Sequence, residues 1–115
     1  MINAGNKSAR LLKAMFSAAL MLGWAGTVEA QTPAAQRGQT FVLTNCARCH
    51  AVDHVSASPL TIAPPFRTLH LKYPIENLEK PLSEGLVTGH PTMPEFRLDP
   101  GQVGDVIAYL KSLER

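Results

Sequence analysis

Both cysteines of this 115-residue chain lie in one pentapeptide, Cys46-Ala47-Arg48-Cys49-His50. The C-x-x-C-H spacing is typical of covalent attachment of a c-type haem. Each cysteine can form a thioether with one haem vinyl group, and two intervening residues let both sulfurs reach the same porphyrin edge. His50 then falls under the ring, where its imidazole can bind the iron. The motif predicts one haem c, attached through Cys46 and Cys49, with His50 as an iron ligand.

Three other interpretations of the cysteine pair remain open at this point. A zinc site needs about four Cys or His ligands, and the chain has no second cysteine pair. A thioredoxin-like dithiol needs a βαβ pattern nearby, and none is visible. A structural disulfide is the simplest alternative, but it gives no reason for His50 to follow Cys49.

The first thirty residues have the pattern of a cleavable secretory signal peptide. Lys7, Arg10 and Lys13 form a basic start, and a mainly apolar run of about fifteen residues covers 14–28. Cleavage is expected after Ala30, at the small-residue site that ends this segment. A retained membrane anchor is the alternative, but the apolar run is shorter than the roughly 20 residues that span a bilayer. We therefore expect a signal peptide over 1–30, export to the periplasm, and no stable membrane span after cleavage.

Loss of the signal peptide changes the charge and the size of the chain. Three basic residues and Glu29 leave with residues 1–30, so the formal net charge falls from +2 to zero. A neutral chain has no basic footprint for nucleic acid. The remaining residues 31–115 suffice for one small domain, and a domain of this size often needs a large ligand or a staple for stability. A covalently held haem would be such a stabilising ligand.

The remaining sequence predicts helices and loops but no strand of useful length. One helix is expected from Ala35 to about Asn45, with Thr32 as a cap and Pro33 at its first position. Another is expected from Pro100 to about Glu114, opened by an Asp99–Gln102 capping box. Between them, 50–66 and 88–98 read as loops. Helical spacing of apolar residues at 66–73 and 75–86 predicts shorter helices, with Pro81 as an interruption and Gly85 or Gly89 as the end.

The second axial ligand of the iron is expected from the loop at 88–98. Met93 is the only methionine that survives signal cleavage, and prolines stand on both sides of it. A stiff loop lowers the entropy lost when a weak thioether donor is held against iron. His90 is an alternative ligand, His54 and His70 are weaker ones, and an open sixth position is a further alternative. We expect His50 and Met93 as the metal ligands, which raises the reduction potential.

Five stretches in this order resemble the small class I c-type cytochromes of bacteria: Gly38, the Cys46–His50 motif, Ala63-Pro-Pro-Phe66, Gly89-His-Pro-Thr-Met-Pro94 and Val106-Ile-Ala-Tyr-Leu110. The resemblance spans most of 34–114. It implies a monohaem cytochrome c domain over 31–115, all-α, with three to five helices around one covalent haem. It also implies that the first and last helices cross where Gly38 meets Tyr109. A proline carbonyl of the Ala63-Pro-Pro stretch would accept a hydrogen bond from His50.

The expected function is one-electron transfer in the periplasm, without catalysis by the chain itself. The expected partners are a redox protein that donates and another that accepts electrons, with the chain a monomer. The alternative is a haem c subunit of a larger dehydrogenase or oxidase complex. A third hypothesis, an enzyme or gas sensor with an open iron position, lacks a distal acid–base set in the sequence.

Overall fold

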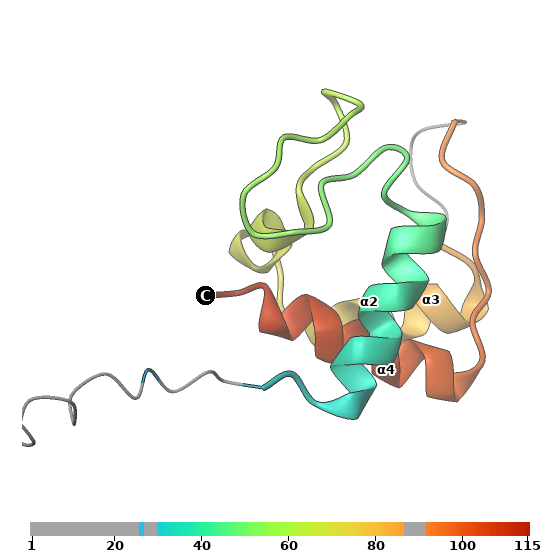
Figure 1. The fold of residues 1–115 in the computed structure, drawn as a ribbon. Coiled ribbons are helices and arrows are strands. Elements are labelled where there is room, and N and C mark those ends of the chain that lie inside the picture. The colour runs from blue at the N-terminus through green and yellow to red at the C-terminus, as the bar shows by residue number, and fades with distance from the viewer. Residues whose placement is uncertain (1–25, 27–29, 87–91) are drawn as a thin grey trace, which may run out of the picture.

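The computed structural model describes residue 26 and residues 30–86 and 92–115 of the chain. Its elements, labelled as in Figure 1, follow in this order: α2 (Pro33–Asn45), η1 (Phe66–Leu71), η2 (Ile75–Leu78), α3 (Glu79–Glu84) and α4 (Pro100–Ser112). The two η elements are 3₁₀-helices. The described residues contain no strand, so the prediction of an all-α domain is confirmed. The predicted signal peptide lies almost entirely outside the described residues.

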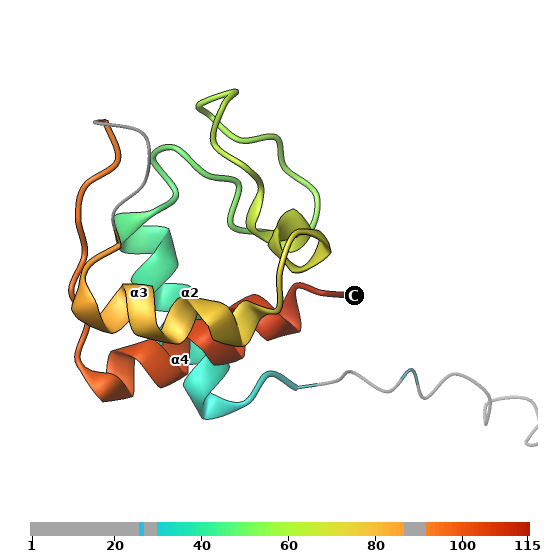
Figure 2. The ribbon, with the colours of Figure 1, turned by 180° about the vertical axis from the view of Figure 1, so that it is seen from behind.

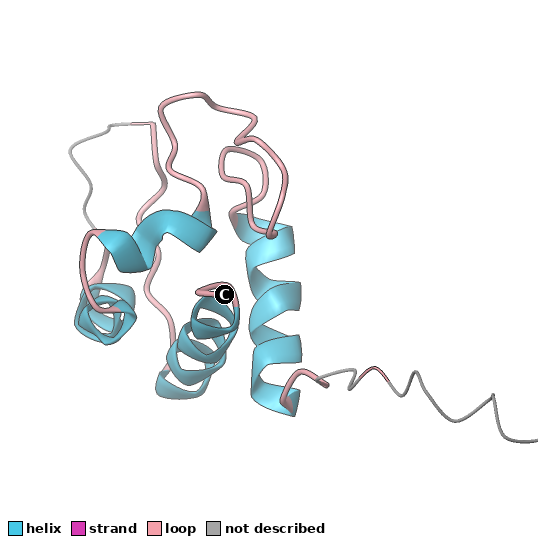
Figure 3. Ribbon diagram, turned by 90° about the vertical axis from the view of Figure 1, so that its left-hand side faces the viewer, coloured by secondary structure: helices cyan, strands magenta, loops and turns pink. Residues whose placement is uncertain are grey.

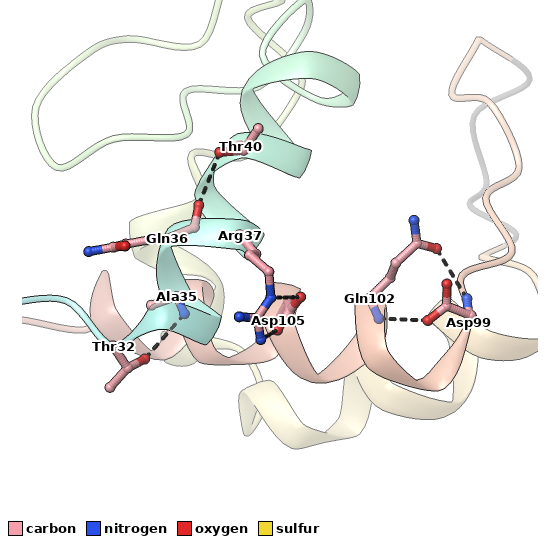
Figure 4. A network of polar contacts seen from close by, with 8 residues as sticks. All are labelled: Thr32, Ala35, Gln36, Arg37, Thr40, Asp99, Gln102 and Asp105. Atoms are coloured by element: carbon pink, nitrogen blue, oxygen red, sulfur yellow. Dashed lines mark hydrogen bonds and ion pairs between the residues drawn. The ribbon is translucent and has the colours of Figure 1, made fainter.

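Helix α2 begins where its sequence signals place it. The Thr32 hydroxyl accepts a hydrogen bond from the backbone N–H of Ala35 at 3.2 Å, and Pro33 occupies the first helical position (Figure 4). Proline is tolerated there because that N–H has no partner within the helix. The helix ends at Asn45, as predicted, so it delivers the chain directly into the cysteine motif.

Helix α4 opens with the predicted capping box. The Asp99 carboxylate accepts from the Gln102 N–H at 2.9 Å, and the Gln102 side chain accepts from the Asp99 N–H at 3.2 Å (Figure 4). These bonds satisfy two backbone donors that a helix start otherwise leaves free. The helix ends at Ser112, two residues before the predicted end.

Helices α2 and α4 cross and form the main packing contact of the domain (Figure 1). At the crossing, a Cβ on Gly38 would overlap the carbonyl oxygen of Asp105 and lie 2.9 Å from the Cβ of Tyr109. Only a residue without a side chain allows the two backbones to approach this closely. The predicted meeting of Gly38 and Tyr109 is confirmed. Arg37 and Asp105 flank it with two hydrogen bonds of 2.8 and 2.7 Å.

Buried apolar side chains from all elements form one core around this crossing. Val42 from α2, Ile75 from η2 and Leu113 after α4 are almost completely buried. The other members are Ala35, Val52, Leu69, Leu82, Leu98, Val103, Val106, Ile107, Tyr109 and Leu110.

The short helices between α2 and α4 reflect two prolines and a glycine. The first 3₁₀-helix, η1, ends at Leu71, and Pro74 occupies the N-cap position of the second, η2. The predicted interruption near Pro81 falls two residues earlier, because η2 gives way to α3 at Glu79. Pro81 then lies in the first turn of α3, where a missing N–H is harmless. Gly85 ends α3 with φ of 120°, a conformation that side chains disfavour.

Two irregular segments rise on the same side of the helical layer. The loop between α2 and η1 and the segment 92–98 both extend away from α4 in three views (Figures 1, 2 and 3). In the part of the chain that the structure describes, no helix is long and apolar enough to cross a bilayer.

Candidate haem-binding site

The C-x-x-C-H motif forms a tight turn at the end of α2. The backbone N–H of Cys46 donates to Val42 O at 2.8 Å, which continues the helix by one residue. The N–H groups of Cys49 and His50 then both donate to Cys46 O, at 3.2 and 3.0 Å. The turn therefore gathers the two cysteines and the histidine within one short piece of backbone.

Both cysteine thiols are free and partly buried. Burial raises the pKa of the Cys46 thiol from 9.0 to about 11, because the thiolate would lose its hydration. Cys46 therefore keeps its proton at neutral pH. Two unlinked thiols at this spacing are the donor set that covalent haem attachment requires.

The His50 ring is held by a proline carbonyl. Its Nδ1 atom lies 2.8 Å from Pro64 O. A carbonyl oxygen only accepts, so Nδ1 carries the hydrogen and the lone pair of Nε2 is free to bind a metal. The Phe66 ring packs against the imidazole with 4.8 Å between centroids. The predicted hydrogen bond from His50 to a proline carbonyl is present. The imidazole therefore fits the role of an iron ligand.

The backbone that follows His50 is fixed by the next loop. The N–H of Ala51 donates to the Ser58 hydroxyl at 3.0 Å, and its carbonyl accepts from the Phe66 N–H at 2.9 Å. The Leu60 N–H also donates to Cys49 O at 3.0 Å. The loop therefore folds back onto the cysteine motif, and this closure brings Pro64 to His50.

The outer part of this loop is organised by a carboxylate. Asp53 accepts from the N–H groups of Val55 and Ser56 and from the Ser56 hydroxyl, at 2.8, 2.6 and 2.5 Å. These hydrogen bonds, that of the Ser56 hydroxyl above all, lower the pKa of Asp53 to about 2. Arg67 closes the loop from η1 by donating to Ser56 O at 2.7 Å.

Met93 lies half-buried in the irregular segment that precedes α4. This segment is pinned to the end of α3, because Leu98 N–H donates to Leu82 O at 2.8 Å and Leu86 N–H to Phe96 O at 3.3 Å. Residues 92–98 form no helix, in agreement with the predicted loop. The other candidate ligand in this loop, His90, lies outside the described residues.

The remaining histidines lie elsewhere. His54 is exposed in the loop after the motif, and His70 lies in η1 with a buried Nδ1 that has no hydrogen-bond partner. Within residues 30–86 and 92–115, no group of three or more His, Cys, Asp or Glu side chains gathers in a way that could hold a metal ion. The zinc interpretation therefore has no donor cluster in this part of the chain.

The structure brings Cys46, Cys49 and His50 together, and it carries Met93 on a segment that rises on the same side of the helical layer (Figure 3). One important contact was not predicted from the sequence. The Tyr109 hydroxyl donates to Val52 O at 2.6 Å and joins α4 to the backbone just after His50. The pattern Val-Ile-Ala-Tyr-Leu indicates a helical tyrosine but carries no signal for the partner of its hydroxyl.

The fold and the attachment motif define a small haem protein of the c type. The family model for cytochrome c matches residues 35–114, so the chain belongs to the cytochrome c family. Members of this family bind haem c through cysteines and serve haem-based electron transfer. A search of curated proteins and a search of solved structures gave no match.

Proposed function

We propose that the chain is an exported one-electron carrier of the periplasm. One haem c would be attached through Cys46 and Cys49, and its iron would be bound by His50 on one face and Met93 on the other. The haem supplies an iron that cycles between the ferrous and ferric states. The chain itself would make and break no bond of a substrate.

The hydrogen bond between His50 and Pro64 is the observation that carries this proposal. It fixes the tautomer that leaves Nε2 free, and it raises the basicity of the ring. A histidine that directly follows two free thiols, with its other nitrogen already satisfied, has the donor arrangement of a haem ligand. A structural disulfide between the cysteines would not require it.

The proposed role of Met93 as an iron ligand is supported by the anchored segment in which it lies. It is the only methionine after residue 30, and its segment is hydrogen-bonded to Leu82 in α3 and to Leu86 just after that helix. Pro94 stiffens the backbone next to it. Such anchoring lowers the entropy lost when a thioether is held against iron, and a Met/His pair favours the reduced state.

The periplasmic location rests on the signal-peptide pattern of residues 1–30. Cleavage after Ala30 predicts that the purified exported protein begins at Gln31. N-terminal sequencing tests this directly, and a chain that retains Met1 would contradict it. The partners would be a redox protein that donates an electron and one that accepts it.

Haem attachment is tested by substituting both cysteines. The exported wild-type protein should retain haem through denaturing electrophoresis, whereas the Cys46→Ala, Cys49→Ala double variant should lose it. Ser112→Ala is a suitable control, because the Ser112 hydroxyl donates to the carbonyl of Tyr109 within the same helix, α4. Retention of haem by the double variant would overturn the proposed attachment.

A haem subunit of a larger dehydrogenase or oxidase is the second candidate, and one observation favours it. The loop after the motif exposes Val55, Leu60 and Ile62, with 85%, 40% and 65% of their surfaces accessible. No Asp, Glu, Lys or Arg occurs from 54 to 66, and exposed apolar patches often mark protein contacts. Co-purification with a catalytic chain would support this candidate. Elution as a monomer at low concentration in size-exclusion chromatography would favour the free carrier.

A further inference from the structure

One buried hydrogen bond joins the C-terminal helix to the backbone that carries the proposed iron ligand. The Tyr109 hydroxyl donates to Val52 O at 2.6 Å, across 57 positions of sequence. Only 2% of Tyr109 and 5% of Val52 is accessible to solvent. Val52 lies two residues after His50. In a buried setting such a bond is costly to lose, because the carbonyl is left without a partner.

The bond at Val52 belongs to a short series of contacts that ends at the His50 ring. Ala51, between His50 and Val52, accepts from the Phe66 N–H at 2.9 Å. Phe66 follows two residues after Pro64, whose carbonyl accepts from His50 Nδ1. These contacts form a continuous series from Val52 through Ala51 and Phe66 to the Pro64 carbonyl that orients the imidazole.

We propose that Tyr109 is a positioning residue for His50. Its hydroxyl holds the backbone at Val52, and it thereby sets the hydrogen bond between His50 Nδ1 and Pro64 O. This inference rests on the proposed role of His50 as an iron ligand. A strong bond at Nδ1 makes the imidazole a better electron donor, which stabilises ferric iron. Loosening this bond should therefore raise the reduction potential.

The hydroxyl can be separated from the packing of the ring. The Tyr109 Cβ approaches Gly38 on α2 and contributes to the helix crossing, whereas the hydroxyl lies at the far end of the side chain and reaches the loop. Tyr109→Phe removes the hydrogen bond and keeps the apolar ring. Gln39 on α2 also interacts with this hydroxyl, so the substitution should be read together with Gln39→Ala.

The test compares holoproteins. In Tyr109→Phe we expect a higher midpoint potential and altered hyperfine-shifted NMR resonances of the His50 ring in the oxidised state. If the hydroxyl has a purely structural role, Tyr109→Phe should lower the unfolding midpoint but leave the potential and the His50 resonances unchanged. Unchanged potential and unchanged His50 resonances in Tyr109→Phe would overturn the inference.

Two variants serve as controls. Arg37→Gln removes the ion pair with Asp105 at the same helix crossing and leaves the bond from Tyr109 to Val52 in place, so it should lower stability without moving the potential. Gln39→Ala should also leave the potential unchanged if the bond to Val52 carries the effect. A shift in Arg37→Gln as large as that in Tyr109→Phe would overturn the inference, because it would assign the effect to the loss of stability.

A measurement on the wild type covers the case in which Tyr109→Phe yields no holoprotein. In the reduced protein the Tyr109 hydroxyl proton should exchange slowly and give its own NMR resonance, close in space to the Val52–Asp53 backbone. Absence of this resonance would overturn the inference. A wild-type protein without covalent haem would instead overturn the proposed function. If the wild type carries haem bound by His50 but Tyr109→Phe changes neither the potential nor the His50 resonances, only the positioning role is overturned.

Discussion

The Nδ1 atom of His50 lies 2.8 Å from the carbonyl oxygen of Pro64, 14 residues further along the chain. This contact depends on the closure of a whole loop, since Ala51 is bonded to both Ser58 and Phe66. A histidine next to two cysteines is therefore oriented by backbone that comes much later in the sequence. The attachment motif supplies two thiols and an imidazole, and the following loop orients the imidazole.

Substitution of Gly38 tests the helix crossing. On helix propensity alone, Gly38→Ala should stabilise the protein by about 1 kcal/mol. The new Cβ would overlap the Asp105 carbonyl, however, and overpacking of a tight contact costs about 1–3 kcal/mol or more. We therefore expect a net loss of stability, measured as a lower midpoint in denaturant unfolding of the holoprotein.

Gly104→Ala is the matched control for Gly38→Ala. Gly104 is also helical, but a Cβ there would meet nothing within 4 Å. This variant should be neutral or more stable than the wild type. Equal stability effects of the two substitutions would contradict the close approach of α2 and α4.

Protonation of Asp53 in acid should destabilise the loop after the haem motif. Its pKa lies at about 2, below the ordinary 3.8, because Ser56 and Val55 donate to the carboxylate. A lowered pKa means that the contribution of Asp53 to stability is full above pH 3.8 and is lost as the pH falls through about 2. An NMR titration of the Asp53 carboxyl group in the holoprotein checks this value.

Two variants rank the causes of the low pKa of Asp53. The Ser56 hydroxyl has the largest influence and the charge of Arg67 the smallest. Ser56→Ala should therefore move the pKa of Asp53 toward its ordinary value by more than Arg67→Gln does. The reverse order would show that the ionic contact, and not the turn, controls the carboxylate.

Met93→Ala should remove the sulfur ligand while the covalent haem stays in place. We expect loss of the sulfur-to-iron charge-transfer band in the oxidised protein and a lower reduction potential, since a thioether favours ferrous iron. His90→Ala is the control and should leave both unchanged. An intact band in Met93→Ala, or its loss in His90→Ala, would assign the distal position differently.

Local signals in the sequence were sufficient to predict most of the helical framework. Thr32 with Pro33, and Asp99 with Gln102, mark helix starts because each pair satisfies backbone donors within one turn. The predicted starts and ends of α2 and α4 hold to within two residues. The change from η2 to α3 at Glu79 was placed too late, because Pro81 is compatible with the first turn of a helix.

Contacts between distant segments could not be read from local patterns. The bond from Tyr109 to Val52 and the pair of Arg37 with Asp105 join residues that are 57 and 68 positions apart. Each depends on how α4 is placed against α2, which no spacing of residues specifies. The roles of Cys46, Cys49, His50 and Met93 in haem binding remain predictions.

An optical spectrum of the exported protein, oxidised and then reduced, tests the His50–iron–Met93 axis most directly. The account predicts a low-spin haem with a sulfur-to-iron charge-transfer band in the oxidised state and no immediate binding of carbon monoxide in the reduced state at neutral pH. A spectrum without the sulfur band, or rapid binding of carbon monoxide, would contradict ligation of the iron by both residues.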